Sequence, residues 1–89
     1  MAYKVLIYED AQKFINNLDK VNRGRIKDFL IDLAKTDNPR SFGDYKPLIG
    51  SNDCRYRVGD YRIICEIEDE IITVFVIRVE HRKKIYKKK

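Results

Sequence analysis

The hydrophobic period of this 89-residue chain changes twice, and that change limits the possible folds more than any other feature of the sequence. Residues 3–8 alternate within a β-branched and aromatic run, which predicts a strand. Between residues 11 and 34 the apolar side chains recur at intervals of three and four, which is the spacing of amphipathic helices. Alternation returns after residue 53. The chain is therefore expected to combine a sheet with helices that cover it.

Two helices in tandem are predicted for the middle of the chain. Asp10 is expected to cap the first helix and Asp19 the second, because a carboxylate accepts from the free N–H groups of a helix start. Asn38-Pro39 stops the second pattern, since the residue before a proline avoids helical backbone angles. The apolar stripes consist of Ala11, Phe14, Ile15 and Leu18 in the first helix and of Ile26, Phe29, Leu30, Leu33 and Ala34 in the second.

A β-hairpin is predicted after an irregular loop. Residues 39–53 contain prolines, glycines and small polar residues, and they are expected to form mainly a loop with a short strand near 42–45. Residues 54–58 then alternate between apolar and polar side chains, and residues 61–67 do so apart from Ile64. Gly59-Asp60 joins them as a two-residue turn.

The last strand completes the predicted fold. After Asp69-Glu70, the nearly continuous apolar run 71–79 predicts a central strand that is covered on both sides. The fold class is α+β in the order β-α-α-β-β-β, with a small antiparallel or mixed sheet and a helical hairpin on one face. Residues 1–89 are expected to form one domain, which ends in a short basic segment from about residue 80.

Composition excludes several classes of protein. No apolar run approaches the roughly 20 residues of a membrane helix, and no secretory cleavage site is visible, so we expect a cytoplasmic protein. Cys54 and Cys65 lack the spacing and the histidines of a metal site, so we expect core thiols, no metal and no cofactor. The two cysteines face each other across the predicted hairpin. A disulfide is not expected, because this is a hydrogen-bonded pair that bridges only with strain.

Positive charge is concentrated at the C-terminus. The chain has a net charge of +5, and residues 78–89 carry seven basic side chains against one acidic one. A basic end on a nearly neutral body indicates an anionic partner, most commonly nucleic acid, and Lys83 and Lys84 are candidate RNA-binding residues. The alternative is a lysine-rich tail that is merely solvated.

Arginines gather on one face of the predicted hairpin. The turn at Gly59-Asp60 places Arg57 directly opposite Arg62, with Arg55 on the same face. Like charges in this position destabilise a sheet, whereas a bound polyanion would reverse the effect, because guanidinium groups bind phosphate bidentately. In the alternative interpretation, Arg55 and Arg62 pair with glutamates farther along the strand, at positions 66 and 68.

Most enzyme classes lack support in this sequence. It has no paired carboxylates beside a nucleophile, no glycine-rich phosphate loop and no metal-ligand cluster. RNA cleavage without a metal remains, in which the ribose 2′-hydroxyl attacks the adjacent phosphate. Arginines would stabilise the charge, and Tyr86 or His81 would assist proton transfer.

Three segments, taken in order, resemble the RelE branch of the RelE/ParE superfamily of toxins from toxin-antitoxin systems. They are Lys46-Pro47-Leu48-Ile49-Gly50, Tyr56-Arg57-Val58-Gly59-Asp60-Tyr61-Arg62 and His81-Arg82-Lys83-Lys84-Ile85-Tyr86. The resemblance implies a small twisted sheet with a helical hairpin on one face. It also implies a metal-independent endoribonuclease that cuts messenger RNA in the ribosomal A site and so inhibits translation.

The same resemblance implies a role for each candidate site residue. Arg55 and Arg57 would orient the RNA and stabilise charge. Arg62 would hold the scissile phosphate, and Arg82 would stabilise or protonate the leaving oxygen. Tyr86 would stack on a base.

The implied partners are the ribosome, its messenger RNA and a RelB-like antitoxin that forms a hetero-oligomer with the toxin. A basic protein is expected to bind an acidic, partly disordered chain that folds on contact. Two alternatives stay open at this point. One is a ParE-like toxin that poisons DNA gyrase by protein contact, and the other is an RNA-binding module without catalysis.

Overall fold

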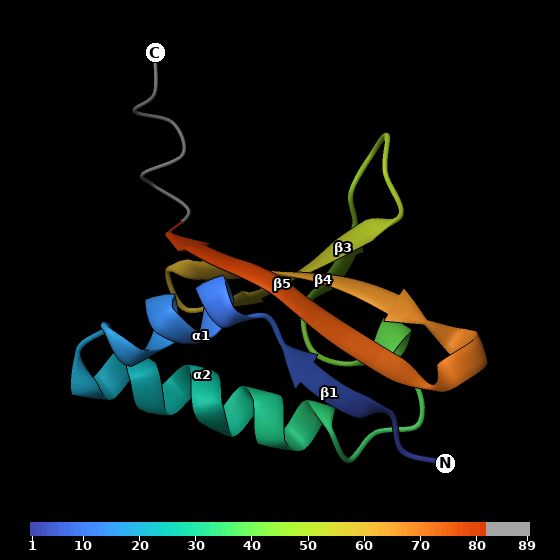
Figure 1. Ribbon diagram of the computed structural model, residues 1–89, viewed down its shortest axis with the longest axis horizontal. Coiled ribbons are helices and arrows are strands. Elements are labelled where there is room, and N and C mark those ends of the chain that lie inside the picture. The colour runs from blue at the N-terminus through green and yellow to red at the C-terminus, as the bar shows by residue number, and fades with distance from the viewer. Residues whose placement is uncertain (82–89) are drawn as a thin grey trace.

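The structure, a computed structural model, describes residues 1–81 and consists of two helices and a five-stranded sheet (Figure 1). The elements are β1 (Lys4–Ile7), α1 (Glu9–Asn16), α2 (Lys20–Leu33), β2 (Tyr45–Pro47), β3 (Asp53–Val58), β4 (Tyr61–Glu68) and β5 (Thr73–His81), with 3₁₀ turns at Pro39–Ser41 and Asp69–Ile71. The strand order is β1-β5-β4-β3-β2. Only β1 and β5 pair in parallel, so the sheet is mixed and the predicted α+β class is confirmed.

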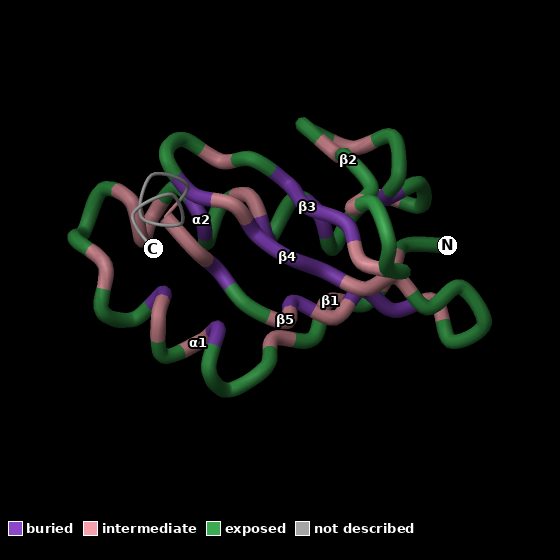
Figure 2. The backbone as a smooth tube through the Cα atoms, turned by 90° about the horizontal axis from the view of Figure 1, so that it is seen from above, coloured by how far each residue is buried: buried purple, intermediate pink, exposed green. Residues whose placement is uncertain are grey.

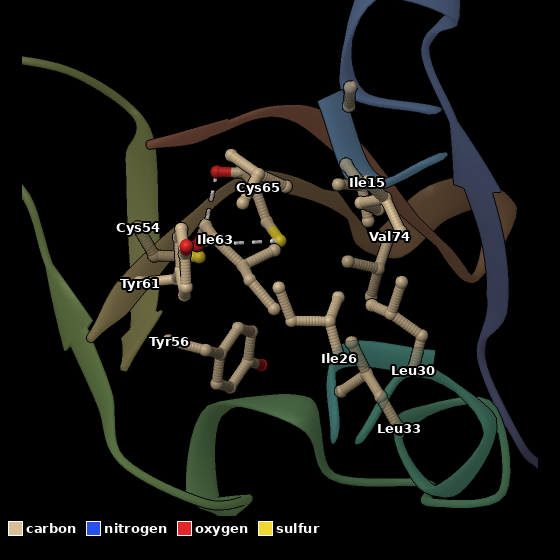
Figure 3. Close-up of a cluster of buried hydrophobic side chains, with 13 residues drawn as sticks. Ile15, Ile26, Leu30, Leu33, Cys54, Tyr56, Tyr61, Ile63, Cys65 and Val74 are labelled. Carbon is tan, nitrogen blue, oxygen red and sulfur yellow. Dashed lines mark hydrogen bonds between the residues drawn. The ribbon is translucent and has the colours of Figure 1, made fainter. Parts of the chain in front are cut away.

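Both helices pack on the same face of the sheet, as predicted (Figure 1). Ile26, Leu30 and Leu33 of α2 are buried at the intervals of three and four that the sequence shows. They point toward Tyr56 and Val74 from the sheet (Figure 3). Burial is concentrated along β3 and β4 in the backbone view (Figure 2). The other face of the sheet carries no helix among residues 1–81.

The helix ends agree only in part with the prediction. Asp19 caps α2, because its Oδ2 accepts from the backbone N–H of Asn22 at 3.1 Å. Asp10 is not a cap, because α1 begins at Glu9 and Tyr8 precedes it. Asp10 lies in the first turn, where a negative charge favours the helix dipole. α2 ends at Leu33, before Asn38-Pro39, and the backbone then turns through hydrogen bonds from Lys35 to the carbonyl of Asp32 and from Thr36 to that of Leu33.

Two strand predictions also need correction. The short strand expected near 42–45 is β2, which starts at Tyr45. The last strand begins at Thr73 and not at residue 71, because Asp69–Ile71 form a 3₁₀ turn and Ile72 has a φ of 50°. Helices cover one side of β5 only. On the opposite side Phe75 is half-buried and Arg78 is exposed.

The pairing of β5 with β4 contains a β-bulge. Cys65 pairs with Val76, whereas Ile64 pairs with Arg78, so Ile77 is an extra residue in β5. The bulge leaves both Val76 and Val79 buried on the helix side. It thereby keeps Arg78 on the opposite side, together with Ile64.

The β3–β4 hairpin has the predicted register. Gly59 adopts a φ of 59°, a backbone angle that side-chain-bearing residues rarely take. Val58 pairs with Tyr61, and Arg57 pairs with Arg62. The prediction of which side chains of β3 and β4 share a side of the sheet is therefore confirmed.

Cys54 and Cys65 are free, buried thiols on the helix side of this hairpin. They are cross-strand partners, and the thiol of Cys54 donates to the carbonyl of Cys65 at 3.6 Å (Figure 3). Burial raises the pKa of Cys54 from its usual 9.0 to about 11, and burial also raises the pKa of Cys65. The predicted core thiols are confirmed.

These thiols predict a loss of stability at alkaline pH. Above pH 9.0 the unfolded chain releases the thiol protons, whereas the folded protein keeps them up to about pH 11 at Cys54. The free energy of unfolding should therefore fall as pH rises between these values, by roughly 1 kcal/mol per thiol and pH unit. Urea denaturation at several pH values measures this slope. A slope that is equally steep in a Cys54→Ala, Cys65→Ala variant would contradict the assignment.

No helix within residues 1–81 combines the length and the apolar character that crossing a membrane requires.

Candidate functional site

The sheet face without helices carries two cross-strand rows in which most side chains are basic. The first row is Arg57 on β3, Arg62 on β4 and Glu80 on β5. The second row is Lys46, Arg55, Ile64 and Arg78, on β2 to β5 in that order. Side chains two positions apart on a strand point to the same side, so both rows share one surface. We call Arg55, Arg57, Arg62 and Arg78 the arginine face.

Arg55 is largely a structural member of the arginine face. Its side chain is only 7% exposed, and it donates to the backbone carbonyl of Asp44 at 2.9 Å. The carboxylate of Asp44 lies 3.4 Å from the same nitrogen. Arg55 therefore ties the segment before β2 to the sheet. Its partner is Asp44 and not the glutamates at positions 66 and 68 that the sequence offered.

Arg57 is the more available of the two arginines on β3. Its side chain is 45% exposed, and its Nε lies 3.9 Å from Asp44 Oδ2. A pair at this distance and exposure contributes little stability. Arg57 also stands directly opposite Arg62, and this pairing of like charges across the ladder is unfavourable.

Arg62 is held from the other side by Glu80. The Nη2 of Arg62 lies 3.4 Å from Glu80 Oε1, and Glu80 Oε2 accepts from the Nε of Arg78 at 2.9 Å. The Nε of Arg62 is buried without a hydrogen-bond partner, and it is the one such side-chain atom within residues 1–81. An unsatisfied buried donor costs about 1–3 kcal/mol. The contact with Glu80 therefore holds Arg62 in a position that costs its Nε a hydrogen bond.

Acidic side chains occupy the far end of the same face. Asp53 pairs in register with Glu66, and Glu68 follows on the same side of β4. Hydrogen bonding with Glu68 raises the pKa of Glu66. The face is thus polarised along β3 and β4, with cations near the Gly59 turn and carboxylates at the opposite end. A polyanion is attracted to the turn end only.

His81 lies on the helix side of the sheet, away from the arginine face. It pairs in register with Tyr61, and the two rings meet edge to face with centroids 5.0 Å apart. Tyr61 also contacts Phe14 of α1. The structure therefore does not bring His81 together with Arg62.

Four predicted site residues lie outside the described residues: Arg82, Lys83, Lys84 and Tyr86. They follow directly on His81. β5 ends at His81, beside the row of Arg57, Arg62 and Glu80. Within residues 1–81, no group of His, Cys, Asp or Glu side chains is arranged to bind a metal ion.

Most of the chain matches one protein-family model. Residues 6–86 match the model described as the ParE toxin of the type II toxin-antitoxin system parDE. The chain belongs to the RelE/ParE superfamily. It is therefore a toxin of the type II toxin-antitoxin class, as its sequence segments implied. A search of curated proteins found no match.

Solved structures of RelE proteins share this fold. A chain of the RelBE2 toxin-antitoxin complex from Mycobacterium tuberculosis is 28% identical, with a TM-score of 0.80 over 92% of this chain and 100% of that one. The RelB-RelE complex from Methanococcus jannaschii gives 30% identity and a TM-score of 0.75, covering 91% and 94%. A free E. coli RelE mutant gives 30% identity and a TM-score of 0.71, covering 97% and 92%. These neighbours confirm the predicted RelE branch.

Sequence reasoning did not assign Asp44, Arg78 or Glu80 to the site of this RelE-like chain. The spacing of Arg78 and Glu80 on one strand was a visible signal, since residues two apart share a face. Their placement beside Arg62 depends on the bulge in β5, which the apolar run did not reveal. Asp44 reaches Arg55 only because β2 pairs with β3.

We expect alanine substitutions of Arg55 and Arg57 to have different effects on the free energy of unfolding. Arg55→Ala should lower the free energy of unfolding by about 2 kcal/mol, because it removes a charged hydrogen bond to a backbone carbonyl. Arg57→Ala should leave it unchanged or raise it by up to about 1 kcal/mol, because it removes repulsion from Arg62. Urea denaturation at low salt measures both. Equal losses in the two variants would contradict these separate roles.

Proposed function

We propose that this toxin is a ribosome-dependent endoribonuclease that cuts messenger RNA in the A site and thereby inhibits translation. The observation that carries this proposal is the placement of Arg57 beside Arg62 at the cationic end of the open sheet face. Direct pairing of two like charges across the ladder does not itself stabilise the sheet, whereas a phosphate between the two guanidinium groups would be bound by both.

The proposed reaction needs no metal. The 2′-hydroxyl of the ribose attacks the adjacent phosphorus, and the bond from phosphorus to the 5′-oxygen of the next nucleotide breaks. The products are a 2′,3′-cyclic phosphate and a 5′-hydroxyl end. Arg57 and Arg62 would stabilise the negative charge that develops on the phosphate oxygens. Arg82 would stabilise or protonate the leaving oxygen, and Tyr86 would stack on a base.

The ribosome is an expected participant because the described part of the site supplies charge and little acid-base chemistry. The carboxylates nearest to the arginine face are Asp44 and Glu80, and both are engaged with arginines. His81 lies on the other side of the sheet. Orientation of the RNA by the ribosome would then account for much of the rate acceleration. We expect little cleavage of free RNA.

We also propose a RelB-like antitoxin as partner in a cytoplasmic hetero-oligomer. The Mycobacterium tuberculosis, Pyrococcus horikoshii and Methanococcus jannaschii neighbours are toxin-antitoxin or RelE-RelB complexes. A hollow of about 280 Å³ between β1 and the helices offers an apolar docking site, lined in part by Val5, Ile7 and the exposed Ile31. A partner with apolar and acidic residues would fit this hollow and the arginine face.

Gyrase poisoning is the second candidate, because the matching family model is described as a ParE toxin. Such a toxin would act by protein contact and would have no need for the paired arginines to meet a phosphate. The two functions therefore differ in whether messenger RNA is cut.

Primer extension on a message translated in vitro tests the nuclease. We expect cuts at A-site codons with the wild-type protein and at least a 100-fold loss in an Arg62→Ala, Arg82→Ala variant, since preorganised charge commonly contributes roughly 10²–10³ in rate. A Lys20→Ala, Lys35→Ala variant is the matched control. It removes the same charge from exposed positions in and just after α2, and it should cut normally.

The remaining outcomes separate the alternatives. Growth arrest on expression without any cut in the message would reject the nuclease in favour of gyrase poisoning. Binding to RNA with neither cuts nor arrest would favour a non-catalytic module. Normal cutting by the Arg62→Ala, Arg82→Ala variant would place the active site elsewhere.

A further inference from the structure

We propose that Glu80 is a positioning residue, which orients Arg62 toward a bound phosphate and is itself kept from repelling that phosphate by Arg78. This inference rests on the proposed function, because it deepens the role of Arg62 in binding the RNA. Neither the resemblance to RelE toxins nor the charge pattern of the sequence assigned a role to Glu80 or Arg78.

The contacts of Glu80 are directional. Its two oxygens serve two different arginines, with Oε1 3.4 Å from Nη2 of Arg62 and Oε2 2.9 Å from Nε of Arg78. All three residues lie on the side of the sheet that carries no helix, and Glu80 is the direct cross-strand partner of Arg62. Fixing one carboxylate from both sides limits the positions that the Arg62 guanidinium can take.

Burial makes the contact between Glu80 and Arg62 more than a surface ion pair. The side chain of Glu80 is 20% exposed and that of Arg62 is 26% exposed, whereas Arg78 is 55% exposed. Charges that are largely shielded from water are screened less by salt. The pair therefore persists under conditions in which exposed ion pairs contribute little.

Repulsion explains why Arg62 needs such a partner. Arg57 stands opposite Arg62 on one side, and Glu80 stands opposite it on the other. Without the carboxylate, the like charge on Arg57 would drive the Arg62 guanidinium out toward solvent. Arg62 keeps its place even though its Nε is buried without a partner, so an attraction must offset that loss.

Arg78 resolves the conflict that a carboxylate beside a phosphate site creates. Glu80 alone would repel the incoming phosphate. Because Arg78 neutralises Glu80, the group of three residues keeps a net charge of +1, and the terminal nitrogens of Arg62 remain attractive to an anion. The carboxylate therefore orients Arg62 without cancelling its charge.

Glu80→Gln tests the positioning role in single-turnover cleavage on programmed ribosomes. We expect the rate constant at saturating toxin to fall roughly 10- to 100-fold, as for a catalytic group displaced by about 1 Å. The toxin concentration at half-saturation should not rise, because the substitution removes a negative charge. In an Arg62→Ala background the same substitution should change the rate less than about twofold, since the two residues act as a unit.

Glu66→Gln is the matched control. It neutralises a glutamate on the same face of β4, two rows from Arg62, and it should leave the rate unchanged. Melting temperatures of all variants are measured beside the rates. A rate loss in Glu80→Gln that is equally large in the Arg62→Ala background would overturn the proposal, because it would reflect general damage to the fold.

A second measurement separates this inference from the proposed nuclease. The Nε–Hε resonance of Arg62 is followed by NMR while inorganic phosphate is added. We expect a phosphate-dependent shift in the wild-type protein and in Glu66→Gln, and a much smaller one in Glu80→Gln. An unaltered response in Glu80→Gln overturns the role of Glu80 even if the toxin cuts RNA. A lost response, with no cutting by the wild type, rejects the nuclease and retains Glu80 as the residue that orients an anion-binding arginine.

Discussion

The pairing of β3 with β4 carries both the core and the arginine face, because alternate side chains of these strands point to opposite sides of the sheet. Tyr56 and Ile63 face the helices and are fully buried, while Arg57 and Arg62 face away. A register slip of one residue would bring charges into the core and apolar side chains into solvent. The buried residues therefore hold the arginines in place, and the turn at Gly59 fixes the register for both.

Much of this arrangement follows from local sequence. The period of the apolar residues predicted both helices, and Gly59-Asp60 set the register that places Arg57 opposite Arg62. These predictions succeed because they depend on neighbours that are close along the chain. The cap at Asp19 is local in the same way, whereas Asp10 was misassigned because the chain already turns into the helix at Tyr8.

The features that could not be predicted from the sequence depend on contacts between segments that are far apart along the chain. β1 lies beside β5 at the edge of the sheet, although most of the chain separates them. Arg55 is held by Asp44 and Arg62 by Glu80, and both partners come from strands or loops whose register only the folded sheet defines. The long apolar run of β5 also suggested cover on two sides, whereas within residues 1–81 helices cover only one side of this strand (Figure 1).

The bulge at Ile77 changes which residues of β5 face the helices. Up to Val76 the even-numbered residues face the helices, and from Val79 onward the odd-numbered residues do. The strand therefore absorbs one additional residue without exchanging its two sides. In a regular strand of the same sequence, Arg78 and Glu80 would turn toward the core and Val79 toward solvent. A single irregular step in the backbone thus allows an apolar segment and a charged segment to share one continuous strand.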